Sequence, residues 1–262
     1  MAYNAGYLDG FPCWPELTTP EPASVTRFYG RLFGWTYEHL GPRVWNSTLC
    51  LLDGSPVAGM APPPPGLDVP KPSWTIFMAT SEVEASLVRV QANSGEPLVL
   101  PTQMPLGRMA VVHDREGAPF GLLQPSSRVR PPPKGTPGTL CWNELHVQNP
   151  GAADDFYQSL FGYECEQTGD GVDYDYVLWK VRGETACGRL RIPYEQDGFA
   201  PRWVNYFTVD TIGKSQAVIE REGGSVLINA YEMPHGLVAL AADPGGARFA
   251  LCQHDNGNAA VP

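Results

Sequence analysis

The sequence lacks long apolar runs and is poor in positive charge. Its 262 residues include 18 lysines and arginines against 28 aspartates and glutamates, which gives a net charge of −10. No stretch approaches the ~20 apolar residues of a membrane-spanning helix, and the first residues have neither the basic nor the apolar region of a signal peptide. These absences lead us to expect a soluble, cytoplasmic protein. Because phosphate groups are bound by clustered lysines and arginines, we also expect that it binds neither nucleic acid nor a membrane.

Several common catalytic and cofactor motifs are also missing. The sequence has no glycine-rich dinucleotide or phosphate loop, no H-E-x-x-H motif and no G-x-S-x-G motif. Its six cysteines form no C-x-x-C pair, and none of their spacings suggests a zinc site. We expect buried, reduced thiols that pack as small apolar groups, and no cofactor.

An internal duplication dominates what the sequence does contain. The segment Cys13–Leu17 recurs as Cys141–Leu145, and Phe28–Trp35 recurs as Phe156–Tyr163, each 128 residues later. After a one-residue insertion the offset becomes 129, and further pairs are Trp74 with Trp203, Asp114 with Asp243 and Gln124 with Gln253. We therefore predict two fused domains, residues 11–125 and 139–254, joined by a proline-rich linker over residues 126–138.

Each half divides again into two modules of strand, helix and three strands. In the first helix Val25, Phe28, Tyr29 and Leu32 follow helical spacing, and Gly34 is placed to end it. Its counterpart in the second half begins with Asn149 as N-cap. Further helices are expected over residues 83–93 and 212–222, and strands over 11–18, 45–52, 57–61, 174–181 and 186–192. The expected class is α+β.

This arrangement resembles the vicinal oxygen chelate superfamily, which includes glyoxalase I, extradiol dioxygenases and bleomycin-resistance proteins. The carriers are the F-Y-x-x-L-F-G helix and the D-x-x-G ending, each present twice. The resemblance covers nearly the whole chain. It implies four βαβββ modules that form two open, cup-shaped β-barrels, with the helices outside and a ligand on each concave face.

The resemblance also identifies where a metal would bind. Metal-dependent relatives carry a His, Gln or Glu about fifteen residues before the helix tyrosine, and a Glu on the final strand. Here the first-strand positions fall at or next to Trp14, Trp74, Trp142 and Trp203, and the final-strand positions fall on Gly121 and Ala250. An indole offers no lone pair to a metal, so we predict no metal at the usual site. The alternative is a relocated site made by Glu144, His146 and His235.

The ligand-binding and catalytic candidates follow from strand geometry. Residues two apart share a face, so Glu144 and His146 are expected together in the second cup, with Glu16 in the first and Leu17 and Leu145 facing the helices. A carboxyl group beside an imidazole in an aromatic cup is a reasonable acid–base pair. We expect Trp14 and Trp74 on the concave face of the first cup, and Trp142 and Trp203 on that of the second. The predicted substrate-binding residues are Trp14, Trp74, Trp142, Trp203, Trp45, Arg108, His235 and Tyr176.

A structural role is the alternative for each of these groups. The tryptophans could fill the sheet where relatives bind a ligand, and the glutamates could only accept hydrogen bonds from the backbone or from an indole. A histidine inside a protein is more often a hydrogen-bonded interior residue than a catalyst.

Three functions remain open from the sequence. The first is a metal-independent enzyme, a lyase, cyclase or isomerase, that moves protons on an aromatic polyketide-like metabolite. The second is a protein that binds and sequesters a small aromatic molecule, and the third is a metal-dependent glyoxalase or dioxygenase. The tandem supplies the two domains that single-domain relatives obtain by pairing, so a monomer or a homodimer is expected.

Overall fold

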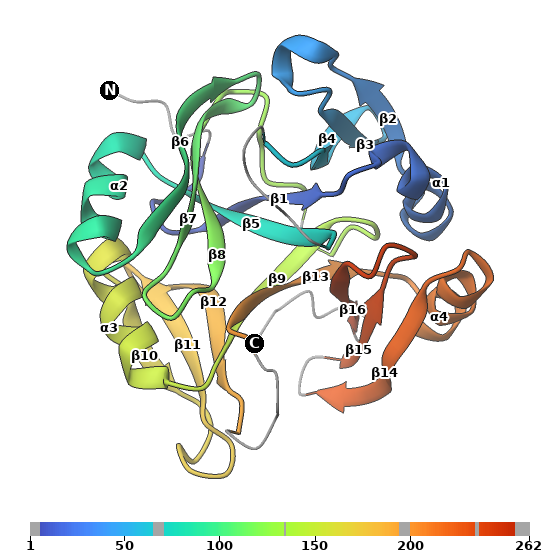
Figure 1. Ribbon diagram of the computed structural model, residues 1–262. Helices are drawn as coiled ribbons and strands as arrows, with labels where there is room; N and C mark the ends of the chain where they lie inside the picture. Colours follow the sequence, from blue (N-terminus) through green and yellow to red (C-terminus); the bar gives the residue numbers. More distant parts are fainter. Residues whose placement is uncertain (1–5, 65–70, 134, 194–199, 234–235, 255–262) are drawn as a thin grey trace. The chain divides into compact units, whose positions relative to one another are not determined.

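The computed structural model describes residues 6–64, 71–133, 135–193, 200–233 and 236–254 (Figure 1). The first repeat contains β1 (Pro12–Thr18), α1 (Pro22–Phe33), β2 (Thr36–His39), the 3-10 helix η1 (Pro42–Val44), β3 (Thr48–Leu52), β4 (Ser55–Ala61), β5 (Ser73–Ala79), α2 (Val83–Ala92), β6 (Glu96–Met104), β7 (Gly107–His113) and β8 (Pro119–Pro125). The second contains β9 (Leu140–Val147), α3 (Pro150–Phe161), β10 (Glu164–Gln167), β11 (Tyr176–Val181), β12 (Glu184–Arg191), β13 (Arg202–Thr208), α4 (Ile212–Arg221), β14 (Ser225–Met233), β15 (Gly236–Ala242) and β16 (Arg248–His254).

Each repeat forms one eight-stranded sheet. The strand orders are β2-β3-β4-β1-β5-β8-β7-β6 and β10-β11-β12-β9-β13-β16-β15-β14, so the second sheet repeats the first element by element. The first strand of each module pairs in parallel with the last, as β1 does with β4 and β9 with β12. Within the described part of the chain, the end strands of each sheet do not pair with each other. The predicted fold class, α+β with four modules and open cup-like sheets, is confirmed.

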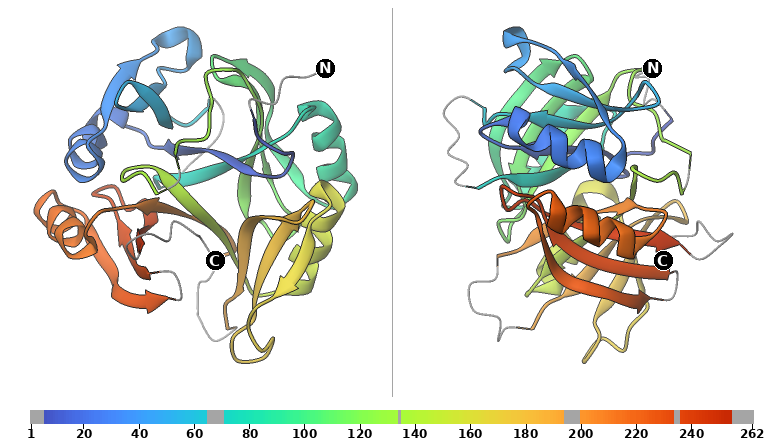
Figure 2. Two further views of the ribbon diagram at one scale, coloured as in Figure 1. Left: turned by 180° about the vertical axis from the view of Figure 1, so that it is seen from behind. Right: turned by 90° about the vertical axis from the view of Figure 1, so that its right-hand side faces the viewer.

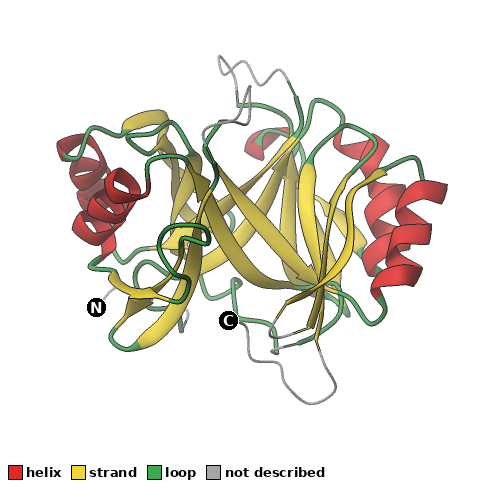
Figure 3. Cartoon of the chain, turned by 90° about the horizontal axis from the view of Figure 1, so that it is seen from below, coloured by secondary structure: helices red, strands yellow, loops and turns green. Residues whose placement is uncertain are grey.

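The compact units of the chain do not coincide with the repeats. One unit combines residues through Trp14 with residues 76–131 and 143–204, and the other combines residues 15–75 and 132–142 with residues from Asn205 onward. In the first unit α2 packs against α3, and in the second α1 packs against α4 (Figure 2). Each helix pair lies against one face of its unit's strands (Figure 3). Modules therefore pair across the two halves, a question that the sequence left open. The predicted boundaries at residues 11–125 and 139–254 mark the two repeats of the sequence and stay a prediction.

The prolines and glycines at the ends of the first helix of each repeat set its limits through their backbone conformation, not through side-chain caps. Pro22 and Pro150 begin α1 and α3, and Gly34 and Gly162 end them in the left-handed conformation, with φ of 75° and 73°. Asn149 does stand at the N-cap of α3, but its side chain makes no capping hydrogen bond.

The core of the unit that contains α1 and α4 is aromatic. Leu17 and Trp74 pack there with residues of α1 and with Phe207 and Phe249, all of them buried. The expectation that Leu17 faces the helices is confirmed. Trp74 was expected on the concave face, and that placement is wrong, because its indole lies in the same helix-covered core.

A chain of hydrogen bonds fixes both of the second-module tryptophans. Trp74 Nε1 donates to the hydroxyl of Tyr29 at 2.9 Å, and that hydroxyl donates to Asp243 at 3.0 Å. In the other unit Trp203 donates to Tyr157 at 3.0 Å, and Tyr157 donates to Asp114 at 3.1 Å. The predicted concave placement of Trp203 is therefore also wrong. Each indole is therefore part of a hydrogen-bond chain that links a helix to the turn before the last strand of a module.

Other differences lie at element boundaries. The edge strands β2 and β10 were not predicted, and their residues are mostly exposed, so no apolar alternation marks them. The predicted strand that began at Trp45 starts instead at Thr48. Among the described residues no helix is both long and apolar enough to cross a membrane.

Candidate active site

Two predicted catalytic residues meet on strand β9. His146 Nε2 lies 2.7 Å from Oε1 of Glu144, and the two side chains are 11% and 7% exposed. Alternation along the strand places both on one face, because residues two apart in a strand point the same way. Leu145 between them is fully buried on the opposite face. The geometry therefore gives a carboxyl–imidazole pair that is largely shielded from water.

The strands next to β9 place mostly apolar residues on the sheet face that carries this pair. Strand β12 pairs with β9 so that Gly188 lies beside Glu144 and Leu190 beside His146. Strand β11 follows, with Tyr176 paired to Leu190. Side chains of directly paired residues share a face of the sheet, so His146, Leu190 and Tyr176 form one row. The predicted residues Glu144, His146 and Tyr176 are thus brought together.

A second tyrosine extends this row toward solvent. The rings of Tyr174 and Tyr176 are stacked, with centroids 5.7 Å apart and planes 3° from parallel. Tyr176 is buried whereas Tyr174 is 44% exposed. Partial burial, and then the negative charge of Glu144, raise the pKa of the Tyr174 hydroxyl. The raised pKa keeps the Tyr174 hydroxyl protonated at neutral pH.

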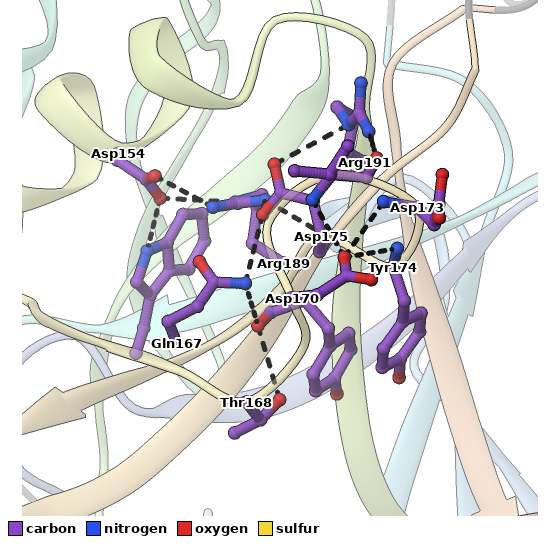
Figure 4. A network of polar contacts seen from close by, with 12 residues as sticks. Asp154, Gln167, Thr168, Asp170, Asp173, Tyr174, Asp175, Arg189 and Arg191 are labelled. Carbon is purple, nitrogen blue, oxygen red and sulfur yellow. Dashed lines mark hydrogen bonds and ion pairs between the residues drawn. The ribbon is translucent and has the colours of Figure 1, made fainter.

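A buried arginine holds the segment between the two tyrosines (Figure 4). Arg189 on β12 donates from Nη1 to Asp175 at 2.7 Å and from Nη2 to Asp154 of α3 at 3.0 Å. Trp179 Nε1 also donates to Asp154, at 2.8 Å. Because Asp175 stands between Tyr174 and Tyr176, this network anchors the stacked rings from the helix side of the sheet.

The turn before Tyr174 is closed by one carboxylate. Oδ1 of Asp170 accepts the backbone N–H groups of Val172, Asp173 and Tyr174 at 2.8–2.9 Å (Figure 4). These hydrogen bonds hold the pKa of Asp170 below its ordinary value. Arg191 contacts Asp175 at 3.6 Å and the carbonyl oxygen of Val172. The exposed tyrosine is thereby fixed although it lies on a loop.

Comparison with known proteins identifies the family. No family model matches the chain. The chain is 31% identical to the anthracycline biosynthesis protein DnrV of Streptomyces peucetius, covering 94% of each chain. It is 29% identical to CFP32 of Mycobacterium tuberculosis, whose name assigns it provisionally to the glyoxylases, covering 96% of this chain and 97% of that one.

Solved structures show the same fold at low identity. The Mn(II)-bound glyoxalase of Novosphingobium aromaticivorans matches with a TM-score of 0.66 and 13% identity over 94% of this chain and 82% of its own. The 2,3-dioxygenase LapB of Pseudomonas sp. KL28 matches with a TM-score of 0.64 and 12% identity over 96% of each chain. The chain belongs to the vicinal oxygen chelate superfamily.

The metal position that this superfamily implies does not fit the residues present. In the first repeat the final-strand position is Gly121, which pairs with Phe77 of β5. A Cβ atom on Gly121 would lie 2.1 Å from the Phe77 ring, so the ring occupies the space of a longer side chain. In the second repeat Ala250 is paired with Tyr206 in the same way. Neither position offers a ligand atom.

The relocated metal site has two of its three expected members in place. Glu144 and His146 lie together, but among the described residues no third His, Cys, Asp or Glu joins them to make a metal-binding group. His235 lies outside the described residues. A carboxyl group in direct contact with an imidazole is an arrangement suited to acid–base chemistry.

The first repeat offers a weaker version of the same site. Trp14 is buried, and its Nε1 has no hydrogen-bond partner among the described residues. Glu16 is half-buried and close enough to Cys50 that its charge, after burial, raises the pKa of that thiol. Thr18 stands where the second repeat has His146. The superfamily fold is thus duplicated, but the carboxyl–imidazole pair is not.

Of the remaining predicted binding residues, Arg108 and Trp45 lie elsewhere, whereas Trp142 shares strand β9, and by alternation the same strand face, with Glu144 and His146. Arg108 forms an ion pair with Glu84 of α2 at 2.5 Å, so its charge is already matched. Trp45 is half-buried in the turn after η1, with φ of 56°. Trp142 is buried on β9, two residues before Glu144.

Sequence reasoning missed the support beneath the site. Arg189 is 3% exposed at its side chain, and no motif distinguishes it from surface arginines. Tyr174 begins the strand predicted over residues 174–181 but was not among the predicted binding residues. The D-Y-D-Y run around it, two acidic residues alternating with two aromatic ones, is the signal that could have found it.

Proposed function

We propose that this member of the superfamily is a tailoring enzyme that moves protons on a flat aromatic metabolite. The observation that carries the proposal is the 2.7 Å contact between Glu144 and His146 beside the stacked rings of Tyr174 and Tyr176. An imidazole held in place by a carboxylate is suited to act as a general acid and base. A planar ligand requires an aromatic surface against which to stack. The second repeat supplies both.

The pair has a simple division of roles. The carboxylate of Glu144 accepts the Nε2–H of His146, which fixes the ring and leaves Nδ1 to exchange a proton with the ligand. Nδ1 takes a proton from a carbon next to a carbonyl group, and the resulting imidazolium is stabilised by Glu144. The proton is then returned to another ligand atom, which completes an isomerisation or ring closure, or to a leaving hydroxyl, which departs as water. Each route conserves protons and needs no other reactant.

The relatives support the substrate class. DnrV and DauV, both from Streptomyces, are named as anthracycline biosynthesis proteins and are 31% and 30% identical to this chain. Anthracyclines are fused-ring aromatic compounds, which suits a wall made of two parallel tyrosines. We propose a lyase, cyclase or isomerase of natural-product biosynthesis, acting on such a ligand as a monomer or homodimer.

The test uses variants that the duplication itself suggests. Protein treated with EDTA is incubated with fused-ring aromatic polyketide intermediates, and the products are identified by mass spectrometry and NMR. His146→Thr reproduces the residue of the first repeat, and Glu144→Gln removes the carboxylate charge. We expect each to lower kcat by about 10²–10⁴-fold, the usual contribution of general acid–base catalysis. Glu16→Gln is the matched control in the first repeat and should keep activity.

Sequestration is the second candidate, because the same aromatic wall would hold a ligand that does not react. In that case ligand binding quenches tryptophan fluorescence to saturation while the recovered ligand is chemically unchanged.

For the enzyme, wild-type activity in both His146→Thr and Glu144→Gln would disprove the proposed catalytic roles of these two residues.

A further inference from the structure

Three metal-capable side chains meet in the unit that contains α1 and α4. The ligand atoms of Cys141, Cys252 and His254 all lie within 4.8 Å of one another, and each residue is half-buried. Cys252 Sγ is 3.8 Å from Nδ1 of His254. Among the described residues no other group of three His, Cys, Asp or Glu side chains has such an arrangement. The cluster shares no residue with the Glu144–His146 pair.

The backbone holds this cluster in place. Where β9 begins, Gly138 N–H donates to Thr208 O at 2.8 Å and Thr208 N–H donates to Thr139 O at 2.9 Å. Thr208 on β13 is in turn paired with Cys252 on β16. The thiol of Cys141 donates to the carbonyl oxygen of Tyr206 at 3.3 Å. The two cysteines therefore approach each other from the strands on either side of β13, and their separation is set by the sheet.

The first repeat shows which part of this arrangement is structural. Cys13, the counterpart of Cys141, donates to the carbonyl of Phe77 at 3.3 Å, the same contact at the same distance. The counterparts of Cys252 and His254 are Leu123 and Pro125, neither of which can bind a metal. Of the three residues, only Cys141 therefore has a counterpart that contacts the neighbouring strand in the first repeat. The second thiol and the imidazole are additions that the duplicated fold does without.

We propose that Cys141, Cys252 and His254 form a binding site for one zinc ion or a similar thiophilic metal ion. Two thiolates and an imidazole are the ligands that zinc prefers, and three protein ligands leave the fourth tetrahedral position for water or a ligand. Ligand atoms at about 2.0–2.3 Å from a tetrahedral ion lie roughly 3.4–3.8 Å apart. The Cys252–His254 separation already matches that range. Binding displaces one proton from each thiol to solvent, and His254 binds as a neutral imidazole.

Cobalt substitution tests the site directly. The full chain is reduced, stripped with EDTA under argon and titrated with Co²⁺, then with Zn²⁺. We expect one ion per chain, a thiolate-to-cobalt charge-transfer band in the near ultraviolet, and loss of that band when Zn²⁺ displaces Co²⁺. Cys252→Ser and His254→Ala should each weaken Zn²⁺ affinity by about a hundredfold or more, since even residues outside the ligand shell cost about 10–100-fold.

The duplication provides the control. Cys13→Ser makes the equivalent change in the first repeat and should leave the stoichiometry and the band unchanged. Circular dichroism confirms that each variant is folded, and iodoacetamide labelling gives a second readout, because bound Zn²⁺ should protect Cys252. The proposal is overturned by failure to bind Co²⁺ or Zn²⁺, or by Cys252→Ser binding Co²⁺ with the affinity and band intensity of the wild type. It is also overturned by cobalt binding without thiolate absorption, or by a Cys141–Cys252 disulfide in protein purified without reductant and handled under argon.

Discussion

Tyr29 donates its hydroxyl proton to Asp243 at 3.0 Å, although 214 residues separate them in the chain. The same hydroxyl accepts the indole N–H of Trp74. Asp243 Oδ1 accepts the backbone N–H groups of Gly245 and Ala247, both at 2.9 Å. One buried tyrosine therefore joins the first helix of one repeat to the last turn of the other.

Removing this hydroxyl should destabilise the protein. In Tyr29→Phe the indole loses its acceptor and the buried carboxylate loses a donor, so we expect the free energy of unfolding to fall by about 1–3 kcal/mol. Tyr157→Phe should do the same through Trp203 and Asp114. Urea denaturation measures both. Tyr37→Phe is the control, because its hydroxyl is only half-buried and donates to the Thr26 carbonyl, so its loss should cost less. A Tyr29→Phe protein as stable as wild type would contradict the prediction.

The buried carboxyl of Asp243 should make stability depend on pH. Burial raises the pKa of Asp243, against the opposing effect of its backbone and tyrosine hydrogen bonds. A folded-state pKa above the unfolded value means that the folded protein favours the protonated carboxyl, and this contribution is lost as the pH rises through the folded pKa. Wild type should therefore lose stability relative to Asp243→Asn as the pH rises from about 4 toward neutrality.

Urea titrations of both proteins at a series of pH values measure this difference. A difference in unfolding free energy that stays constant with pH, or that moves in favour of wild type as the pH rises, would show that the pKa of Asp243 is not raised.

Arg189 should be needed for folding stability and not only for the site. Its side chain is 3% exposed and is matched by the carboxylates of Asp154 and Asp175. Removing one partner of a buried ion pair leaves charge uncompensated, so Arg189→Gln should lower the free energy of unfolding by about 3–5 kcal/mol. Arg191→Gln is the matched control, because Arg191 contacts the same Asp175 at 3.6 Å with 32% of its side chain exposed. Equal losses in the two variants would argue against a special role for Arg189.

The ring of Phe77 should exclude any side chain at Gly121. A methyl group there would overlap the ring, so Gly121→Ala should cost about 1–3 kcal/mol, the usual penalty for overpacking a core. Adding Phe77→Ala should recover part of the Gly121→Ala loss in a double-mutant cycle measured by thermal unfolding. Gly151→Ala is the control, because a Cβ there meets nothing within 4 Å and Gly151 lies inside α3. If the effects of Gly121→Ala and Phe77→Ala on stability simply add, the Phe77 ring is not what excludes a side chain at position 121.

The sequence by itself determined the duplication, the four modules and the fold class. The evidence was local and repeated: helical spacing around Phe28 and Phe156, the glycines at 34 and 162, and paired landmarks at a nearly constant offset. It also placed Glu144 and His146 on one strand face, because alternation along a strand is a local property. Such features follow from periodicity along the chain and can be recognised without knowledge of tertiary contacts.

Only the tertiary structure decided which modules pack together and where the tryptophans point. Trp74 and Trp203 follow the repeat as closely as Trp14 and Trp142, yet their indoles bind tyrosines on helices far away in sequence. The meeting of Cys141 with Cys252 and His254 has the same origin, since the order of strands in the sheet brings them together. Register and module pairing depend on long-range burial and hydrogen bonding, and spacing along one chain does not encode them.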